Sequence, residues 1–212
     1  MMSHPLAETD LIDVDIELYL GQMGEIFRIF PDQGSGCTSY GVLAHGKRWF
    51  VKHSDHPRGI ESLRRADHLH STVRHPALPR LRHAFETQGG LALFYDWVPG
   101  DLLHDPTRRA QERRRDPAYP PVRFRALPLT EILDALDTIY DAHLALADHG
   151  FIAVDFYDGC IIYDFDRSRT YLCDLDEYQT GPFLLQADRL LGSSRFMAPE
   201  EWQRGAWIDQ VT

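Results

Sequence analysis

The chain has 212 residues, of which 43 % are hydrophobic and 25 % are charged, and this balance is typical of a soluble globular protein. The net charge of −10 argues against nonspecific binding to nucleic acid or to an anionic membrane, because both need an excess of Lys and Arg. We therefore expect no nucleic-acid partner and no membrane partner. Three cysteines without zinc-site spacing, no signal sequence and no long apolar run predict a cytoplasmic protein.

The first part of the chain is predicted to consist mainly of strands. Residues 1–23 are expected to be an N-terminal extension, and 24–53 show alternating segments separated by turn sequences rich in Gly. Apolar residues at helical spacing predict a helix over 59–74 that Pro76 ends. The apolar run 91–98 is typical of a buried strand.

The second part of the chain is predicted to be helical, with one hairpin. Residues 99–128 are basic and rich in proline, which indicates a connector with one short helical piece. A helix is expected from Thr130 to a C-terminal Gly150, followed by a hairpin of two short strands around 166–169. The apolar side chains of this helix are predicted to form one face: Ile132, Leu133, Leu136, Ile139, Tyr140 and Leu144. The whole pattern favours an α+β protein with two lobes, 24–98 and 129–212.

One lysine and three aspartates are the candidate functional residues of this sequence. Lys52 ends a hydrophobic strand, on the same face as Phe50, where an ammonium group can pair with phosphates. Asp155 follows the long helix, in a loop. Asp174 and Asp176 lie two apart after an apolar strand, so we expect both side chains on one side, where they can hold Mg²⁺.

In this order the motifs resemble those of the eukaryotic-like protein kinases, from about Gly24 to the end of the chain. The resemblance implies a bilobal fold, ATP and Mg²⁺ as cofactors, and a protein substrate or a regulatory protein partner. It places the catalytic acid at Asp155 and the metal-binding acid at Asp174. The segment 192–202 is similar to the end of an activation segment. The implied nucleotide-binding residues are Gly34, Ser35, Gly36, Ser39, Lys52, and the hinge residues Asp96 and Val98.

The chain also departs from the family pattern at several of these positions. Cys160 stands where the family has a metal-binding Asn, and Asp158 is the nearest oxygen ligand that can replace it. Asp176 stands where the family has Gly, and Phe50 where a small residue covers adenine. The helix Glu that pairs with the lysine falls at Ala66. Asp67 is our substitute candidate for that ion pair, and Glu61 is the alternative.

Three functions remain open from the sequence. The first is a Ser/Thr protein kinase. The second is a pseudokinase, in which the same fold acts as a binding or regulatory module. The third is a small-molecule kinase of the aminoglycoside- or choline-kinase type, because Asp174-Leu-Asp176 resembles the two acids of those families. The kinase resemblance also implies helices beyond Thr212, so we expect a truncated second lobe with an exposed apolar patch.

Overall fold

The protein consists of two compact units, and each has its own hydrophobic core. The computed structural model describes residues 6, 8–31, 36–104 and 115–210. Unit 1 comprises residues 1–72 and 79–97, and unit 2 comprises residues 73–78 and 98–212. The mixture of helices with a six-stranded sheet confirms the α+β class. No helix within the described ranges has both the length and the apolar character needed to cross a membrane.

Unit 1 is built on the six-stranded sheet, whose strand order is β1-β5-β6-β4-β3-β2. Strand β1 pairs in parallel with β5, and all the other neighbours are antiparallel. The strands are β1 (Leu11–Ile12), β2 (Glu25–Phe30), β3 (Thr38–Ala44), β4 (Lys47–Ser54), β5 (Leu81–Thr87) and β6 (Gly90–Asp96). The turn between β3 and β4 contains His45 and Gly46, both with positive φ, as the turn sequence predicts.

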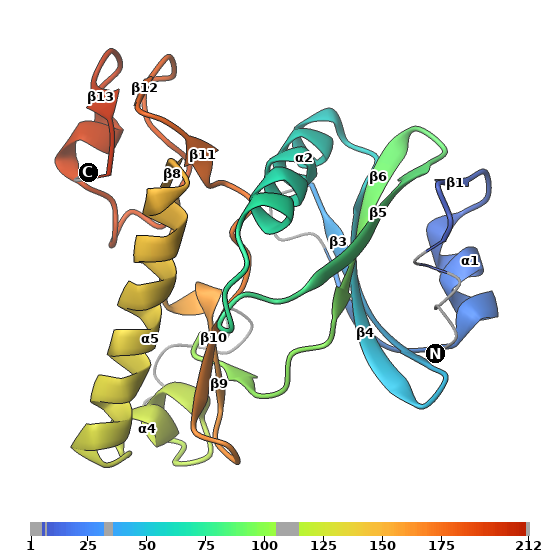
Figure 1. Ribbon diagram of the computed structural model, residues 1–212, viewed down its shortest axis with the longest axis horizontal. Helices are drawn as coiled ribbons and strands as arrows, with labels where there is room; N and C mark the ends of the chain where they lie inside the picture. The colour runs from blue at the N-terminus through green and yellow to red at the C-terminus, as the bar shows by residue number, and fades with distance from the viewer. Residues whose placement is uncertain (1–5, 7, 32–35, 105–114, 211–212) are drawn as a thin grey trace. The chain divides into compact units, whose positions relative to one another are not determined.

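One helix packs on each face of this sheet (Figure 1). Helix α1 (Ile16–Met23) packs Leu20 against the face that carries Trp49 and Val51. Helix α2 (Pro57–Thr72) packs Leu63 and Ala66 against the opposite face. Residues 11–23, which the sequence analysis places in an N-terminal extension, therefore contribute side chains to the core of unit 1. An alternating strand pattern does not reveal that both faces of a sheet will be covered.

Unit 2 is organised around the long helix α5 (Leu129–Asp148) and a three-stranded sheet of order β10-β9-β7. The predicted hairpin is β9 (Ile161–Asp164) and β10 (Arg169–Leu172), with Ile161 opposite Leu172. The connector contains β7 (Asp101–Leu102) and a short helix, α4 (Pro120–Arg125). The remaining elements are β8 (Phe151–Ile152), η2 (Asp158–Cys160), β11 (Gln179–Thr180), β12 (Phe183–Leu184), η3 (Pro199–Trp202) and β13 (Trp207–Ile208).

Helix α5 has the predicted length, but its apolar residues do not form one buried face. Its buried side chains are Ala135, Ala142 and Leu146. Ile132 and Ile139 are half-buried. The other four residues of the predicted face are exposed: Leu133, Leu136, Tyr140 and Leu144. The helix therefore packs through a narrow stripe centred on Ala135, Ala142 and Leu146, and four of the six predicted apolar side chains are exposed.

Candidate functional site

In unit 1, the structure places Lys52 directly opposite Ser39. The two residues are register partners in the antiparallel pair β3–β4, so their side chains share one face of the sheet. That face is the one covered by α2, and only 9 % of Lys52 and 8 % of Ser39 are exposed. Two residues that the kinase resemblance assigns to phosphate binding are therefore neighbours.

The predicted phosphate loop is described at its C-terminal end. Gly34 and Ser35 lie outside the described residues. Gly36 has φ +78°, a left-handed conformation that favours glycine. Its carbonyl oxygen accepts a hydrogen bond from Ser54 Oγ at 2.5 Å. This bond joins the end of the loop to the end of β4, two residues beyond Lys52.

Phe50 belongs to a ring cluster on the α2 face of the sheet. Its ring centroid lies 6.2 Å from Phe30, 6.2 Å from Tyr95 and 6.4 Å from Trp97. Asp96, a predicted hinge residue, follows Tyr95, and its carboxylate accepts two hydrogen bonds from Arg82, at 2.8 and 2.7 Å. Its backbone N–H donates to Arg80 O at 3.0 Å. The other predicted hinge residue, Val98, belongs to unit 2.

The two candidates for an ion pair with Lys52 differ in their positions on α2. Glu61 is on the solvent side: its side chain is 75 % exposed and pairs with Arg65 at 3.2 Å. This position argues against Glu61 as the partner, because the inward face of α2 is the one that carries Ala66. Asp67, one residue after Ala66, is half-buried, and its Oδ1 accepts a hydrogen bond from Ser71 Oγ at 3.3 Å.

In unit 2, Asp155 sits in a tightly constrained loop after β8. Its φ of +57° is uncommon for a residue with a side chain. Its Oδ1 accepts a hydrogen bond from the backbone N–H of Ser193 at 2.8 Å. Burial raises the pKa of Asp155 above its ordinary value, the Ser193 bond opposes this shift, and the negative charge of Asp174 adds to it.

Cys160 joins the loops that carry Asp155 and Asp174. Its side chain is fully buried, and its Sγ lies 3.4 Å from the carbonyl oxygen of Asp155 and 3.9 Å from that of Asp174. The register of β9 and β10 continues here, since Cys173 N–H donates to Cys160 O at 2.8 Å. Burial, with the charge of Asp174 as a further cause, strongly raises the pKa of the Cys160 thiol. The thiol is therefore neutral and serves to pack the two loops together.

The three predicted metal ligands have different surroundings. Asp174 is exposed, whereas Asp176 is only 7 % exposed, so the two carboxylates do not form one solvent-facing pair. Strand alternation does not apply, because β10 ends at Leu172 and Asp174 has φ +57°. Asp158 Oδ1 lies 3.4 Å from His104 Nδ1.

The residues present fit a magnesium ion that arrives with phosphate ligands. No group of three or more His, Cys, Asp or Glu side chains within the described parts of the chain is arranged to hold a metal by itself. Mg²⁺ bound together with a nucleotide needs only one or two protein carboxylates, with phosphates and water as the other ligands. The exposed carboxylate of Asp174 meets that requirement.

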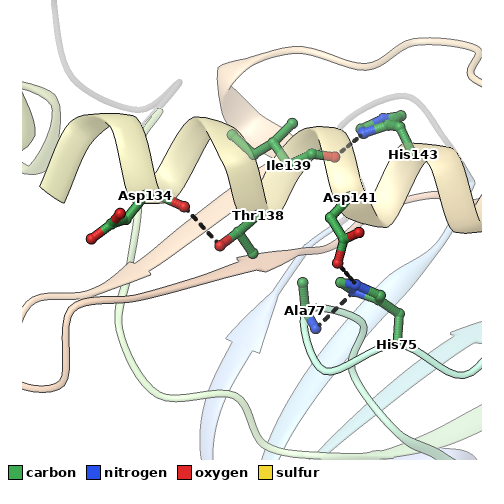
Figure 2. Close-up of polar contacts among 7 residues, drawn as sticks. All are labelled: His75, Ala77, Asp134, Thr138, Ile139, Asp141 and His143. Atoms are coloured by element: carbon green, nitrogen blue, oxygen red, sulfur yellow. Dashed lines mark hydrogen bonds and ion pairs between the residues drawn. The ribbon is translucent and has the colours of Figure 1, made fainter. Parts of the chain in front are cut away.

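Two further residues support this site, and the sequence reasoning did not single them out. Tyr178 is fully buried, and its hydroxyl lies 2.8 Å from His143 Nε2. His143 Nδ1 lies 2.7 Å from Ile139 O within α5 (Figure 2). The ring of His143 also makes an edge contact with Phe156, beside Asp155, at 4.5 Å between centroids. The only sequence signal was helical spacing, which places His143 next to the buried side of α5.

A scan against models of known protein families found no match to this chain, and a search of the curated proteins also found none.

Proposed function

We propose that the chain is a phosphotransferase of the protein-kinase type, which uses ATP and Mg²⁺ and acts on Ser or Thr hydroxyls of a protein. In this proposal Lys52, Ser39 and the loop ending at Gly36 bind the phosphates. Asp155 acts on the acceptor hydroxyl, and Asp174 holds the metal. Phosphoryl transfer depends mainly on positioning and charge stabilisation, so these few groups are the essential ones.

The observation that carries the proposal is that the Cys160 thiol contacts the backbone carbonyl oxygens of both Asp155 and Asp174. An acid that orients the acceptor hydroxyl must lie near the acid that holds the metal–nucleotide. The contacts of one buried Sγ with both carbonyl oxygens meet this condition within a single unit. The raised pKa of Asp155 also favours this role, because it makes the carboxylate a stronger base for the hydroxyl proton.

Each carboxylate has a separate task. Asp155 is held by the Ser193 N–H through Oδ1, which leaves its second oxygen to accept a proton from the substrate hydroxyl. Asp174 is exposed and would hold Mg²⁺ on the nucleotide phosphates. The bound ion would neutralise negative charge on the transferring phosphate.

The first experiment measures nucleotide binding. We expect Mg·ATP at about 100 times Kd to stabilise the full chain by about 2.7 kcal/mol, and therefore to raise Tm by about 5–10 °C. Lys52→Met should abolish this increase. Lys47→Met is the matched control, because Lys47 lies on the same strand but is exposed. Equal stabilisation of both variants by Mg·ATP would contradict the assigned role of Lys52.

The second experiment measures transfer from labelled ATP to a basic protein rich in Ser and Thr. Asp155→Asn should keep nucleotide binding and lower transfer by about 100-fold or more. Asp166→Asn, at an exposed hairpin position, is the control. Transfer that is unchanged in the Asp155 variant would refute the catalytic assignment.

A pseudokinase is the second candidate, and two observations favour it. The buried thiol of Cys160 occupies the position where the resemblance expects a metal-binding Asn. Phe50 contributes a ring to the cluster on the face that also carries Lys52. For this candidate we expect nucleotide binding, if present, without phosphate transfer to any protein. The two experiments above therefore separate the candidates.

A further inference from the structure

Helix α5 carries a row of large apolar side chains on its solvent side. The row consists of Leu129, Leu133, Leu136, Tyr140 and Leu144, with exposed fractions of 69, 48, 41, 67 and 63 %. Spacings of three and four residues keep all five on one side of the helix. At 1.5 Å per residue the row is about 22 Å long, which matches a partner helix of about four turns. We call it the α5 stripe.

Acidic side chains line one border of the α5 stripe. Helical spacing places Asp134, Asp137, Asp141 and Asp148 together along that border. A shallow hollow there is lined by Asp137, Thr138, Tyr140, Asp141 and Leu144, so acidic and apolar groups meet in one depression. Helix α5 contains no Lys or Arg at all.

One of these acids, Asp141, is hydrogen-bonded within unit 2 and still keeps its negative charge and its exposure (Figure 2). His75 Nδ1 accepts a hydrogen bond from the Ala77 N–H, so Nε2 carries the proton and donates to Asp141 Oδ2 at 3.0 Å. The Asp141 side chain is nevertheless 77 % exposed. Figure 2 also shows Asp134 on the same helix. Its backbone carbonyl oxygen accepts a hydrogen bond from the Thr138 hydroxyl, and its carboxylate points away from that bond.

These charges argue against a second copy of this chain as the occupant. In an antiparallel pair of identical helices, each border faces the same border of the partner, so acids would oppose acids. In a parallel pair, the acidic border would face the opposite border of the second α5. That border lies next to the side of α5 that is buried in its own unit, so it offers no basic partner for the acids. The same acids disfavour an anionic lipid surface.

We propose that the α5 stripe is a docking surface for a partner protein, specifically for an amphipathic helix with an apolar row bordered by Lys or Arg. The apolar rows of the two helices pack together, and the basic border of the partner helix faces the acidic border of α5. Charge complementarity of this kind sets the orientation of the docked helix and favours this class of partner over others.

The probes are two synthetic helical peptides of about 18 residues, long enough to cover the stripe. Both have the same apolar row, bordered by Lys and Arg in one and by Glu in the other. Binding to the full chain is measured by fluorescence anisotropy. We expect the basic peptide to bind at least about tenfold more tightly, with an affinity that falls as salt increases.

Two variants locate the binding. Leu133→Ser with Tyr140→Ser should weaken binding of the basic peptide by about tenfold or more, since hot-spot losses at interfaces are commonly of this size. Asp134→Lys with Asp137→Lys should reverse the preference between the two peptides. Leu18→Ser on α1, at a residue 57 % exposed, is the control and should leave Kd unchanged.

Three results would overturn the proposal. One is equal affinity for the acidic and the basic peptide, or no binding of either. Another is a Kd that none of the α5 variants changes. The third is self-association of the unmodified chain in sedimentation experiments that the Leu133→Ser/Tyr140→Ser variant abolishes, because the occupant would then be a second copy.

Discussion

The bond between Tyr178 and His143 gives the sharpest prediction about the site. Because His143 Nδ1 donates to Ile139 O, Nε2 is the acceptor for the Tyr178 hydroxyl. Tyr178→Phe removes the hydroxyl at a position 1 % exposed and leaves Nε2 without its donor. Removal of one partner from a buried hydrogen bond costs about 1–2 kcal/mol. For a chain of this length, that loss lowers Tm by about 2–8 °C.

The pH dependence of this loss has a defined sign. Burial lowers the pKa of His143 below its ordinary value of 6.5, and the bond to Ile139 O opposes that shift. A lowered pKa in the folded state means that the stability contributed by His143 is present above 6.5 and is lost as pH falls toward the folded-state pKa. The Tyr178 hydroxyl can donate only to the neutral ring. The unfolded chain titrates alike with and without the Tyr178 hydroxyl, so the difference between the original chain and Tyr178→Phe should be full above 6.5 and should shrink only as pH falls below 6.5 through the folded-state pKa of His143. The two chains are therefore compared at about pH 7.5 and at about pH 5.

Urea unfolding followed by circular dichroism at both pH values measures these differences. Tyr140→Phe is the control, because its hydroxyl belongs to a side chain 67 % exposed and its loss should cost less than about 0.5 kcal/mol. A Tyr178→Phe variant as stable as the control, or a stability gap that widens on acidification, would contradict the role assigned to this hydrogen bond.

Four other substitutions test local backbone space, charge and ring packing. Gly59→Ala should lower the free energy of unfolding by about 1–3 kcal/mol, because the new Cβ would meet the Ser54 side chain. Gly21→Ala should raise the free energy of unfolding by about 0.5–1 kcal/mol, because there is open space around this helical glycine. Urea unfolding of both variants checks these opposite signs. Asp155→Asn should raise Tm by about 1–3 °C at neutral pH and leave it unchanged at about pH 3. Burial raises the pKa of Asp155, so the ionised carboxylate makes the folded protein less stable as pH rises through that pKa, and Asn carries no such charge. Calorimetry that shows the same Tm for both chains at both pH values would contradict this. Phe50→Ala should cost about 2 kcal/mol from lost ring contacts. It should also tighten Mg·ATP binding, because the resemblance expects a small residue over adenine at this position; weaker binding in titration calorimetry would contradict this.

Local patterns in the sequence predicted most of the secondary structure of the site. The 161–172 hairpin and the long helix α5 occur where turn residues and helical spacing place them. Alternation correctly placed Lys52 on the face of Phe50, because a regular strand presents successive residues to opposite sides. The same rule failed for Asp174 and Asp176, because the chain leaves the strand before it reaches them.

Tertiary structure alone decided which surfaces are covered. Hydrophobicity makes a helix face suitable for burial, but the partner elements determine which residues are buried. Thus α5 packs through Ala135 and Ala142 and leaves Leu133 and Tyr140 in solvent. The sequence by itself determined the α+β class and the order of Lys52, Asp155 and Asp174 along the chain. Only the folded chain placed the buried Cys160 thiol against the carbonyl oxygens of both acids, because that contact joins residues brought together by the pairing of β9 with β10.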